Sequence, residues 1–171
     1  MILNEQQTMI RDVARAFAQE KLAPKAAEWD RTCYFPRAEL REMGKLGFLG
    51  ITVPEEWGGT GADAVSMAVI LEELAAGDAG TSTIVSGHNS VACMPIVQFG
   101  TIEQKERFLR PLASGELTGA FALTEAHGGS EAGAGYRHSS SRPARQDTGW
   151  CVSNRKWAST RRTPVKLLSR K

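Results

Sequence analysis

The chain has 171 residues and a net charge of +2, with 42% hydrophobic and 23% charged residues, a composition typical of a globular protein long enough to bury a core. No apolar run approaches the length of a membrane span, and the first residues lack the features of a secretory signal, so we expect a cytoplasmic protein. Cys33, Cys93 and Cys151 are far apart and in no C-x-x-C spacing, which argues against a disulfide framework or a zinc site.

The first part of the chain predicts three helices. A helix is predicted from six residues that recur near helical spacing: Leu3, Gln6, Ile10, Val13, Phe17 and Leu22. Pro24 and Pro36 each suit the first turn of a following helix, because the missing N–H of proline costs nothing there. Gly47 suits the residue that ends the third helix.

The middle of the chain predicts a loop and three further helices. Residues 48–63 are too rich in glycine and proline for a helix and indicate a structured loop. Asp63 then suits the N-cap of a helix over residues 64–78 that is apolar on most sides, which is typical of a helix buried between others. A second apolar helix over residues 81–100 follows, and after it an N-capped amphipathic helix that ends near Pro111.

After Gly115 the pattern changes to that of a β region. Residues 117–125 are β-permissive and end in a Gly-rich turn, so they predict a strand. The Thr124 hydroxyl at its end, the permissive backbone at Gly129 and the Ser130 hydroxyl together suit an anion beside a flat polar ring, since turn N–H groups bind phosphate oxygens. On this pattern alone, a strand followed by an ordinary turn is the commoner interpretation.

The wider context favours a ligand site. The segment resembles the signature of the acyl-CoA dehydrogenase family, with an acidic residue, Glu131, where the family has Asp. The matching residues are Ala122, Leu123, Thr124, Glu125, Gly128, Gly129 and Ser130. The resemblance extends upstream over nearly all of the helical region, and the Phe-Gly-Thr-x-x-Gln-Lys order at residues 99–105 is its most specific part.

The resemblance implies a fold and a chemistry. The fold is mainly α: an N-terminal helical domain over residues 1–115, then an incomplete β-barrel-like middle domain over residues 116–171. The cofactor is FAD, the substrate an acyl-CoA thioester, the electron acceptor of the electron-transfer flavoprotein type, and the full-length protein a homo-oligomer. In the family, a glutamate removes the α-proton while the β-hydride passes to flavin N5. The residues implied in FAD binding are Phe121, Ala122, Leu123, Thr124, Gly129 and Ser130, and Ser130 also lies near the CoA phosphates.

The end of the chain departs from the family pattern. Residues 1–135 carry a net charge of −7 (11 basic, 18 acidic), whereas residues 136–171 carry +9 (10 basic, one acidic). Around Gly149 and Trp150 the sequence matches the pattern of the family's next strand only in part. We therefore hypothesise that the sequence after about Ala134 comes from a truncated or frame-shifted copy of a family gene. The catalytic glutamate belongs to the missing final helical bundle, so no catalytic residue is assigned and the chain alone is expected to be inactive.

Other interpretations stay open beside this one. The same scaffold, having lost its chemistry, would be a non-catalytic helical binding module. Nucleic-acid binding by the basic tail is disfavoured, because the tail has no recognisable binding fold and few interleaved aromatic residues. His88 is either part of an acyl pocket or, as is commoner for a lone polar residue on a core helix, simply hydrogen-bonded within the core.

Overall fold

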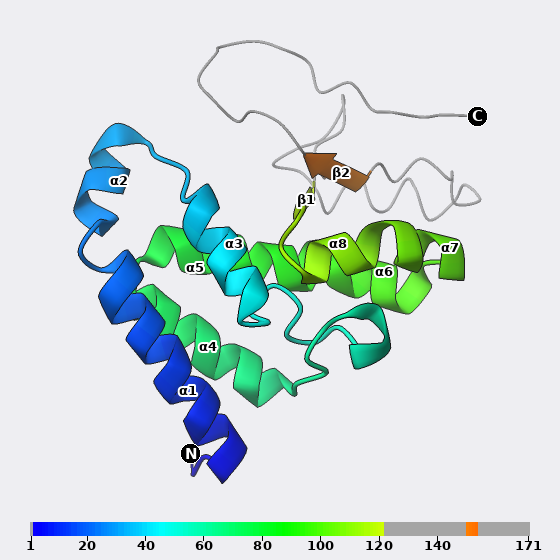
Figure 1. Ribbon diagram of the computed structural model, residues 1–171, viewed down its shortest axis with the longest axis horizontal. Coiled ribbons are helices and arrows are strands. Elements are labelled where there is room, and N and C mark those ends of the chain that lie inside the picture. Colours follow the sequence, from blue (N-terminus) through cyan, green and yellow to red (C-terminus); the bar gives the residue numbers. More distant parts are fainter. Residues whose placement is uncertain (1, 122–149, 154–171) are drawn as a thin grey trace, which may run out of the picture.

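The computed structural model describes residues 2–121 and 150–153 (Figure 1). The helices are α1 (Glu5–Phe17), α2 (Ala26–Thr32), α3 (Arg37–Lys45), α4 (Ala64–Gly77), α5 (Ala79–Gly87), α6 (Met94–Phe99), α7 (Ile102–Gln104) and α8 (Arg110–Ala113). Three π-helical segments, η1 (Ala18–Leu22), η3 (His88–Cys93) and η4 (Lys105–Leu109), continue α1, α5 and α7, and η2 (Glu55–Trp57) is a 3₁₀ turn. The strands are β1 (Thr118–Phe121) and β2 (Trp150–Ser153).

The first helix begins at a capping box. The Asn4 side chain accepts the N–H of Gln7, and the Gln7 side chain accepts the N–H of Asn4. The buried face differs from the predicted one at two positions: Gln6 and Val13 are exposed, whereas the residues after them, Gln7 and Ala14, are buried. The reason is that α1 packs against α4, and the small Ala14 side chain allows the two helices to approach closely.

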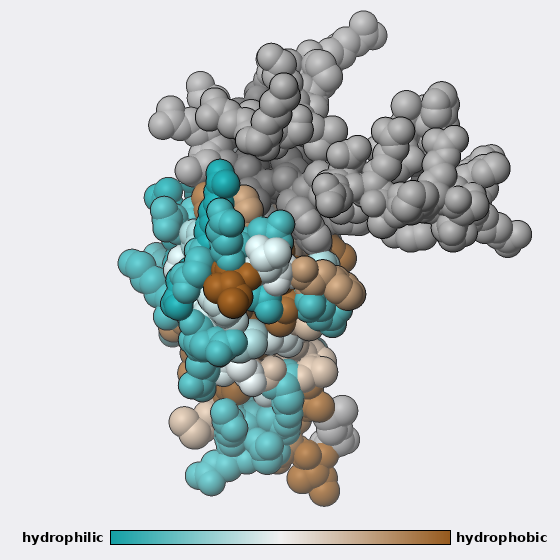
Figure 2. Space-filling view, turned by 90° about the vertical axis from the view of Figure 1, so that its right-hand side faces the viewer, coloured by the Kyte–Doolittle hydropathy of each residue, from teal (hydrophilic) through white to brown (hydrophobic). Residues whose placement is uncertain are grey.

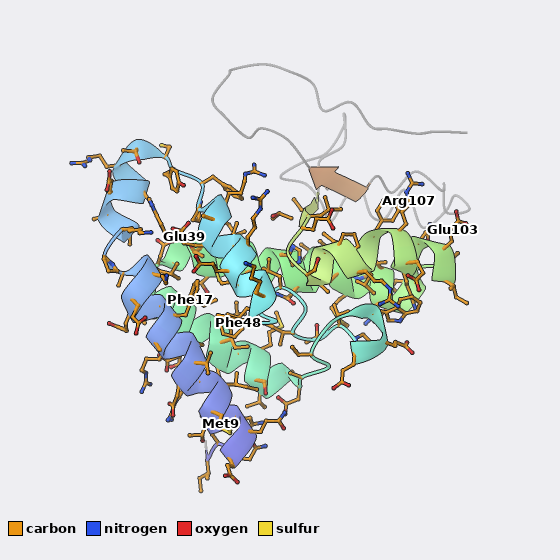
Figure 3. All side chains as sticks on the ribbon, viewed as in Figure 1. Met9, Phe17, Glu39, Phe48, Glu103 and Arg107 are labelled. Atoms are coloured by element: carbon orange, nitrogen blue, oxygen red, sulfur yellow. The ribbon has the colours of Figure 1, made fainter. Side chains whose placement is uncertain are left out.

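The third helix ends as the sequence indicates. Gly47 follows it with φ of +80°, the left-handed conformation that glycine adopts without strain. The Phe48 N–H donates to the Met43 carbonyl and the Gly47 N–H to the Gly44 carbonyl, which together form a Schellman motif. The chain then enters the predicted loop, and Phe48 turns inward to meet Phe17 edge-on, with ring centroids 6.4 Å apart (Figure 3).

The predicted N-caps are confirmed. Asp63 accepts the Ser66 N–H at the start of α4 and also a bond from the Gln7 side chain, which ties this cap to α1. Thr101 forms a capping box with Gln104 at the start of α7. By contrast, Pro24 and Pro36 lie just before their helices rather than inside the first turn, since α2 begins at Ala26 and α3 at Arg37.

Two prolines lie within longer helical runs instead of ending them. Pro95 follows η3, and Pro111 follows η4, so the helix predicted to end near Pro111 continues to Ala113. A π-helical turn widens the backbone ring and changes the hydrogen-bond partners, which accommodates a residue that has no N–H to donate. Among the described residues, no helix has both the length and the apolar character needed to cross a membrane.

The core consists of two clusters of buried side chains. The larger lies between α1, α3, α4 and α5 and contains Ala14, Phe17, Ala18, Leu22, Trp29, Leu40, Met43, Phe48, Leu49, Ile51, Ile70, Leu74 and Val85. The smaller lies under η4 and α8 and contains Val53, Cys93, Ile96, Leu109, Leu112 and Ala113, with Trp57 packed against it. Figure 2 shows one face of this body, where hydrophilic side chains predominate and apolar ones form separate patches.

The chain leaves the helical body through β1. The turn at Gly115, with φ of +76°, packs against Gly44 of α3 and leads into the strand (Figure 1). Strand β1 pairs antiparallel with β2, with Thr118 opposite Ser153 and Phe121 opposite Trp150. The mainly helical fold is therefore confirmed. Within the described ranges the β region amounts to this one pair of short strands, and the division into domains at residues 115 and 116 stays a prediction.

Candidate functional site at the base of strand β1

The base of β1 is bonded directly to the helical body. The Gly119 N–H donates to Nδ1 of His88 on η3 at 3.0 Å, and the Leu117 N–H donates to the Pro111 carbonyl at 2.9 Å. A Cβ atom on Gly119 would lie 2.5 Å from the Cβ of Ala92, so glycine is needed for the strand to lie this close to η3. Two helical segments thus fix where the strand begins.

His88 links the strand to a second segment. Its side chain is fully buried, and Nε2 lies 2.9 Å from the Leu49 carbonyl in the loop after α3. Burial lowers the pKa of His88 from its ordinary value, because the charged imidazolium would lose its hydration. The interpretation of His88 as a hydrogen-bonded core residue is therefore confirmed.

Cys93 is the other reactive side chain beside this ring. Its Sγ lies 3.5 Å from His88 Nε2, and burial raises the pKa of the Cys93 thiol to about 12. At neutral pH the sulfur is thus a thiol rather than a thiolate, so the pair lacks the ionised form that a cysteine nucleophile requires. This Cys–His contact belongs to the core.

Asn89 holds the same loop and was missed in the sequence reasoning. It is fully buried; its Oδ1 accepts the Ile51 N–H, and its Nδ2 donates to the carbonyls of Phe48 and Val85, each at 3.0 Å. The sequence signal was present, since the adjacent polar residues His88, Asn89 and Ser90 interrupt an apolar helical run. A buried polar side chain is normally satisfied, and here the partner groups are backbone atoms of a distant loop.

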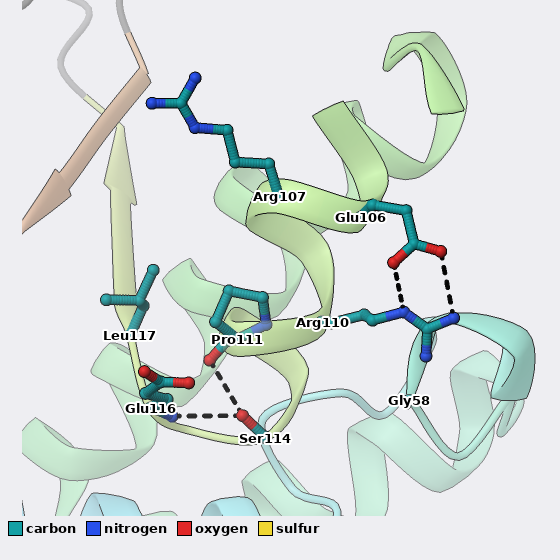
Figure 4. Close-up of a pocket in the computed structure, with 8 residues that line it drawn as sticks. All are labelled: Gly58, Glu106, Arg107, Arg110, Pro111, Ser114, Glu116 and Leu117. Atoms are coloured by element: carbon teal, nitrogen blue, oxygen red, sulfur yellow. Dashed lines mark hydrogen bonds and ion pairs between the residues drawn. The ribbon is translucent and has the colours of Figure 1, made fainter. Parts of the chain in front are cut away.

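A shallow hollow of about 610 Å³ lies beside the base of β1 (Figure 4). Its lining comes from the loop after α3, from η4 and α8, and from the residues that lead into the strand: Gly58, Glu106, Arg107, Arg110, Pro111, Ser114, Glu116 and Leu117. The lining includes charged groups of both signs, and Glu106 pairs with Arg110 through two bonds of 2.7 and 3.3 Å. This pairing lowers the pKa of Glu106, which keeps the carboxylate ionised and unsuited to act as an acid at neutral pH.

Trp57 lies beside two basic side chains of η4 and α8. The Lys105 ammonium lies 5.9 Å and the Arg110 guanidinium 5.6 Å from its ring centroid, which are cation–π distances. The ring packs against the smaller core cluster. Its contacts within the described part of the chain are structural.

The predicted FAD contacts begin where the described strand ends. Phe121 is the last residue of β1, and its backbone is paired with β2. The other predicted contacts, Ala122, Leu123, Thr124, Gly129 and Ser130, lie outside the described residues, so their roles stay predictions. Over residues 2–121 and 150–153, no group of three or more His, Cys, Asp or Glu side chains lies close enough to hold a metal ion.

Comparison with known proteins identifies the family of this helical body. The family model described as "Acyl-CoA dehydrogenase, N-terminal domain" matches residues 4–116, the segment that contains both core clusters and ends just before β1. The chain belongs to the acyl-CoA dehydrogenase family. The resemblance seen in the sequence is thereby confirmed.

Individual members of the acyl-CoA dehydrogenase family show how far the similarity reaches. An acyl-CoA dehydrogenase of Bacillus subtilis is 44% identical over 133 residues, which is 78% of this chain and 35% of that protein. Butyryl-CoA dehydrogenase of Megasphaera elsdenii matches with a TM-score of 0.72 at 38% identity, covering 77% of this chain and 35% of that one. An acyl-CoA dehydrogenase of Bacillus anthracis complexed with FAD matches with a TM-score of 0.66 at 37% identity, over 76% and 23%. The chain spans about a third or less of the length of these relatives.

Proposed function

We propose that this chain forms the N-terminal helical domain and the first flavin-contacting strand of an FAD-dependent oxidoreductase that acts on the Cα–Cβ bond of acyl-CoA thioesters. The observation that carries the proposal is the bonding of β1 to the helical body directly ahead of the family signature. Strand β1 is held at Gly119, and the first residue implied in FAD binding, Phe121, follows two positions later.

The residues of the signature fit a flavin dinucleotide chemically. Thr124 supplies a hydroxyl for the edge of the flavin ring, and the turn at Gly129 and Ser130 supplies backbone N–H groups and a hydroxyl for phosphate oxygens. Ser130 is also proposed to contact the CoA phosphates. When bound, FAD would supply a hydride acceptor. We retain the electron-transfer flavoprotein type of acceptor and the homo-oligomer as proposals for the full-length protein.

The two buried ionisable side chains near β1 supply no base for the reaction. Removal of an α-proton from a thioester requires a positioned base and a stabilised enolate oxygen. Near β1, His88 is buried with both ring nitrogens engaged, and the Cys93 thiol is protonated. We therefore propose that the 171-residue chain by itself has no dehydrogenase activity and binds FAD at most weakly, because half a site leaves much of the cofactor in water.

Two measurements test the proposed function. The purified chain, incubated with FAD and a panel of acyl-CoA thioesters, is expected to give no substrate-dependent dye reduction. A chimera in which this chain's aligned residues replace the matching region of the Bacillus subtilis relative is expected to retain yellow flavin and to reduce the dye.

Substitutions in the chimera make the test specific. Thr124→Ala should lower FAD retention, whereas Thr83→Ala, which removes an exposed hydroxyl bonded to the Ala79 carbonyl on α5, should not. A folded chimera without flavin, or an equal effect of the two substitutions, would contradict the proposal and favour the non-catalytic helical module. Turnover by the unmodified chain alone would show that the base lies within these 171 residues.

A further inference from the structure

The two hydrogen bonds of His88 determine its protonation state. A backbone N–H can only donate, so Nδ1, which accepts from Gly119 at 3.0 Å, carries no proton. The ring proton of the neutral form therefore resides on Nε2, which donates to the Leu49 carbonyl at 2.9 Å. In this single tautomer, His88 bridges β1 and the loop after α3.

The strand depends on this bridge because it carries no anchoring side chain at the contact. At Gly119 the backbone itself touches η3 and α8: an added Cβ would lie 2.5 Å from Ala92 and 3.1 Å from Leu112. A backbone seated in this way is held in register by van der Waals contact, which is weakly directional, and by hydrogen bonds, which are strongly directional. The bond to His88 therefore sets the direction in which β1 leaves the helical body.

We propose that His88, in its neutral Nε2–H form, is a positioning residue that sets the place of β1 up to Phe121, the first residue implied in FAD binding. The flavin part of this inference rests on the proposed function. The anchoring of β1 does not, because it follows from the two hydrogen bonds alone.

Protonation of His88 would undo the anchor. A second ring proton would sit on Nδ1 and face the Gly119 N–H, which places two donors against each other and removes the acceptor. The groups that face the ring are Cys93 from η3, the Leu49 carbonyl from the loop, the Leu112 backbone from α8 and the Gly119 N–H from β1. None of these groups is an acid. The backbone groups of Leu49 and Leu112 favour the imidazolium, but burial outweighs them and lowers the pKa of His88. Protonation of His88 and anchoring of the strand therefore oppose one another.

Two conservative substitutions separate the two hydrogen bonds. His88→Asn places an amide oxygen near the position of Nδ1 and retains an acceptor for Gly119, but does not reach Leu49. His88→Gln places an amide nitrogen near the position of Nε2 and retains a donor for Leu49, but offers no acceptor to Gly119. If His88 served only to hold the core together, the two variants would loosen β1 equally.

The test uses the full chain, labelled with ¹⁵N. We expect a ¹⁵N–¹⁵N coupling across the bond between Gly119 and His88 Nδ1, which disappears as the pH falls. Hydrogen exchange of the Gly119 amide should become about tenfold faster in His88→Gln, because that variant loses the hydrogen bond to Gly119. In His88→Asn, which keeps this bond, the exchange rate should stay within about threefold of that in the unsubstituted chain. The Phe48 amide, bonded to the Met43 carbonyl, serves as the control amide.

The outcomes are distinct. Absence of the coupling, or equal Gly119 exchange in the two variants, overturns the inference. Addition of FAD should shift the backbone amides of β1 in the unsubstituted chain and in His88→Asn more than in His88→Gln, and equal shifts in all three overturn the link to the flavin. If FAD shifts none of these amides while the coupling is present, the flavin part of the proposed function fails for this chain and the anchor stands.

Discussion

The Asn89 side chain on η3 accepts the backbone N–H of Ile51 at 3.0 Å, although the two residues are 38 positions apart in the chain. The same side chain donates to the Phe48 carbonyl, so a buried amide satisfies backbone groups that the loop after α3 cannot satisfy within itself. Together with the bond from His88 to Leu49, it makes the central helical run the support for both the loop and β1.

Replacement of Asn89 should be among the most destabilising single changes in the helical body. Asn89→Ala removes three buried hydrogen bonds and leaves the Ile51 N–H and the Phe48 carbonyl unpaired, so the free energy of unfolding should fall by about 3 kcal/mol. Urea unfolding measures this loss. The neighbouring change Ser90→Ala, at an exposed position, should alter it by less than about 0.5 kcal/mol, and equal losses would contradict the role of Asn89.

Two helical glycines should respond in opposite ways to alanine. A Cβ on Gly44 would press against the Ser114 carbonyl and lie 2.8 Å from the Cα of Gly115, so Gly44→Ala should destabilise the fold by about 1–3 kcal/mol. A Cβ on Gly87 meets no atom of the described residues within 4 Å, so Gly87→Ala should stabilise it by about 0.5–1 kcal/mol. Thermal unfolding of the two variants measures these opposite changes in stability. A stabilised Gly44→Ala variant would contradict the close contact between Gly44 and the turn at Gly115.

Stability should depend on pH through His88. Its pKa in the folded chain lies below its ordinary value of 6.5, so between these two values the unfolded chain binds more protons. The contribution of neutral His88 is therefore complete above about pH 6.5 and is lost as the pH falls through the folded pKa. Urea unfolding at a series of pH values should show this loss in the unsubstituted chain and not in His88→Asn; the same pH slope in both would contradict it.

The two described free cysteines should differ in reactivity. Cys33 is exposed at the end of α2, whereas the Cys93 thiol is buried with its pKa raised to about 12, so at pH 8 only about one molecule in ten thousand carries the Cys93 thiolate. In a Cys151→Ser background, iodoacetamide should label Cys33 in the folded chain, and Cys93 only after unfolding. Mass spectrometry assigns the labelled residue, and rapid labelling of Cys93 in the folded chain would contradict its burial.

Much of the helical architecture was predictable because its determinants are local. The N-caps at Asp63 and Thr101 and the terminating Gly47 each act on backbone groups within a few residues, so short sequence patterns identify them. The helix predicted to end near Pro111 ends two residues later, at Ala113, because the effect of a proline is not purely local. Whether a proline ends a helix depends on whether the preceding turn can widen, and here η4 does so.

The family, the mainly helical body and the strand after Gly115 were thus determined by the sequence itself, through caps, apolar periodicity and a signature read residue by residue. What only the tertiary structure decided is how the strand is held. His88 and Asn89 carry no local signal for their partners, because Leu49, Ile51 and Gly119 are brought to them by the packing of distant segments. A buried polar side chain requires hydrogen-bond partners, but which groups become its partners is determined only when the chain folds.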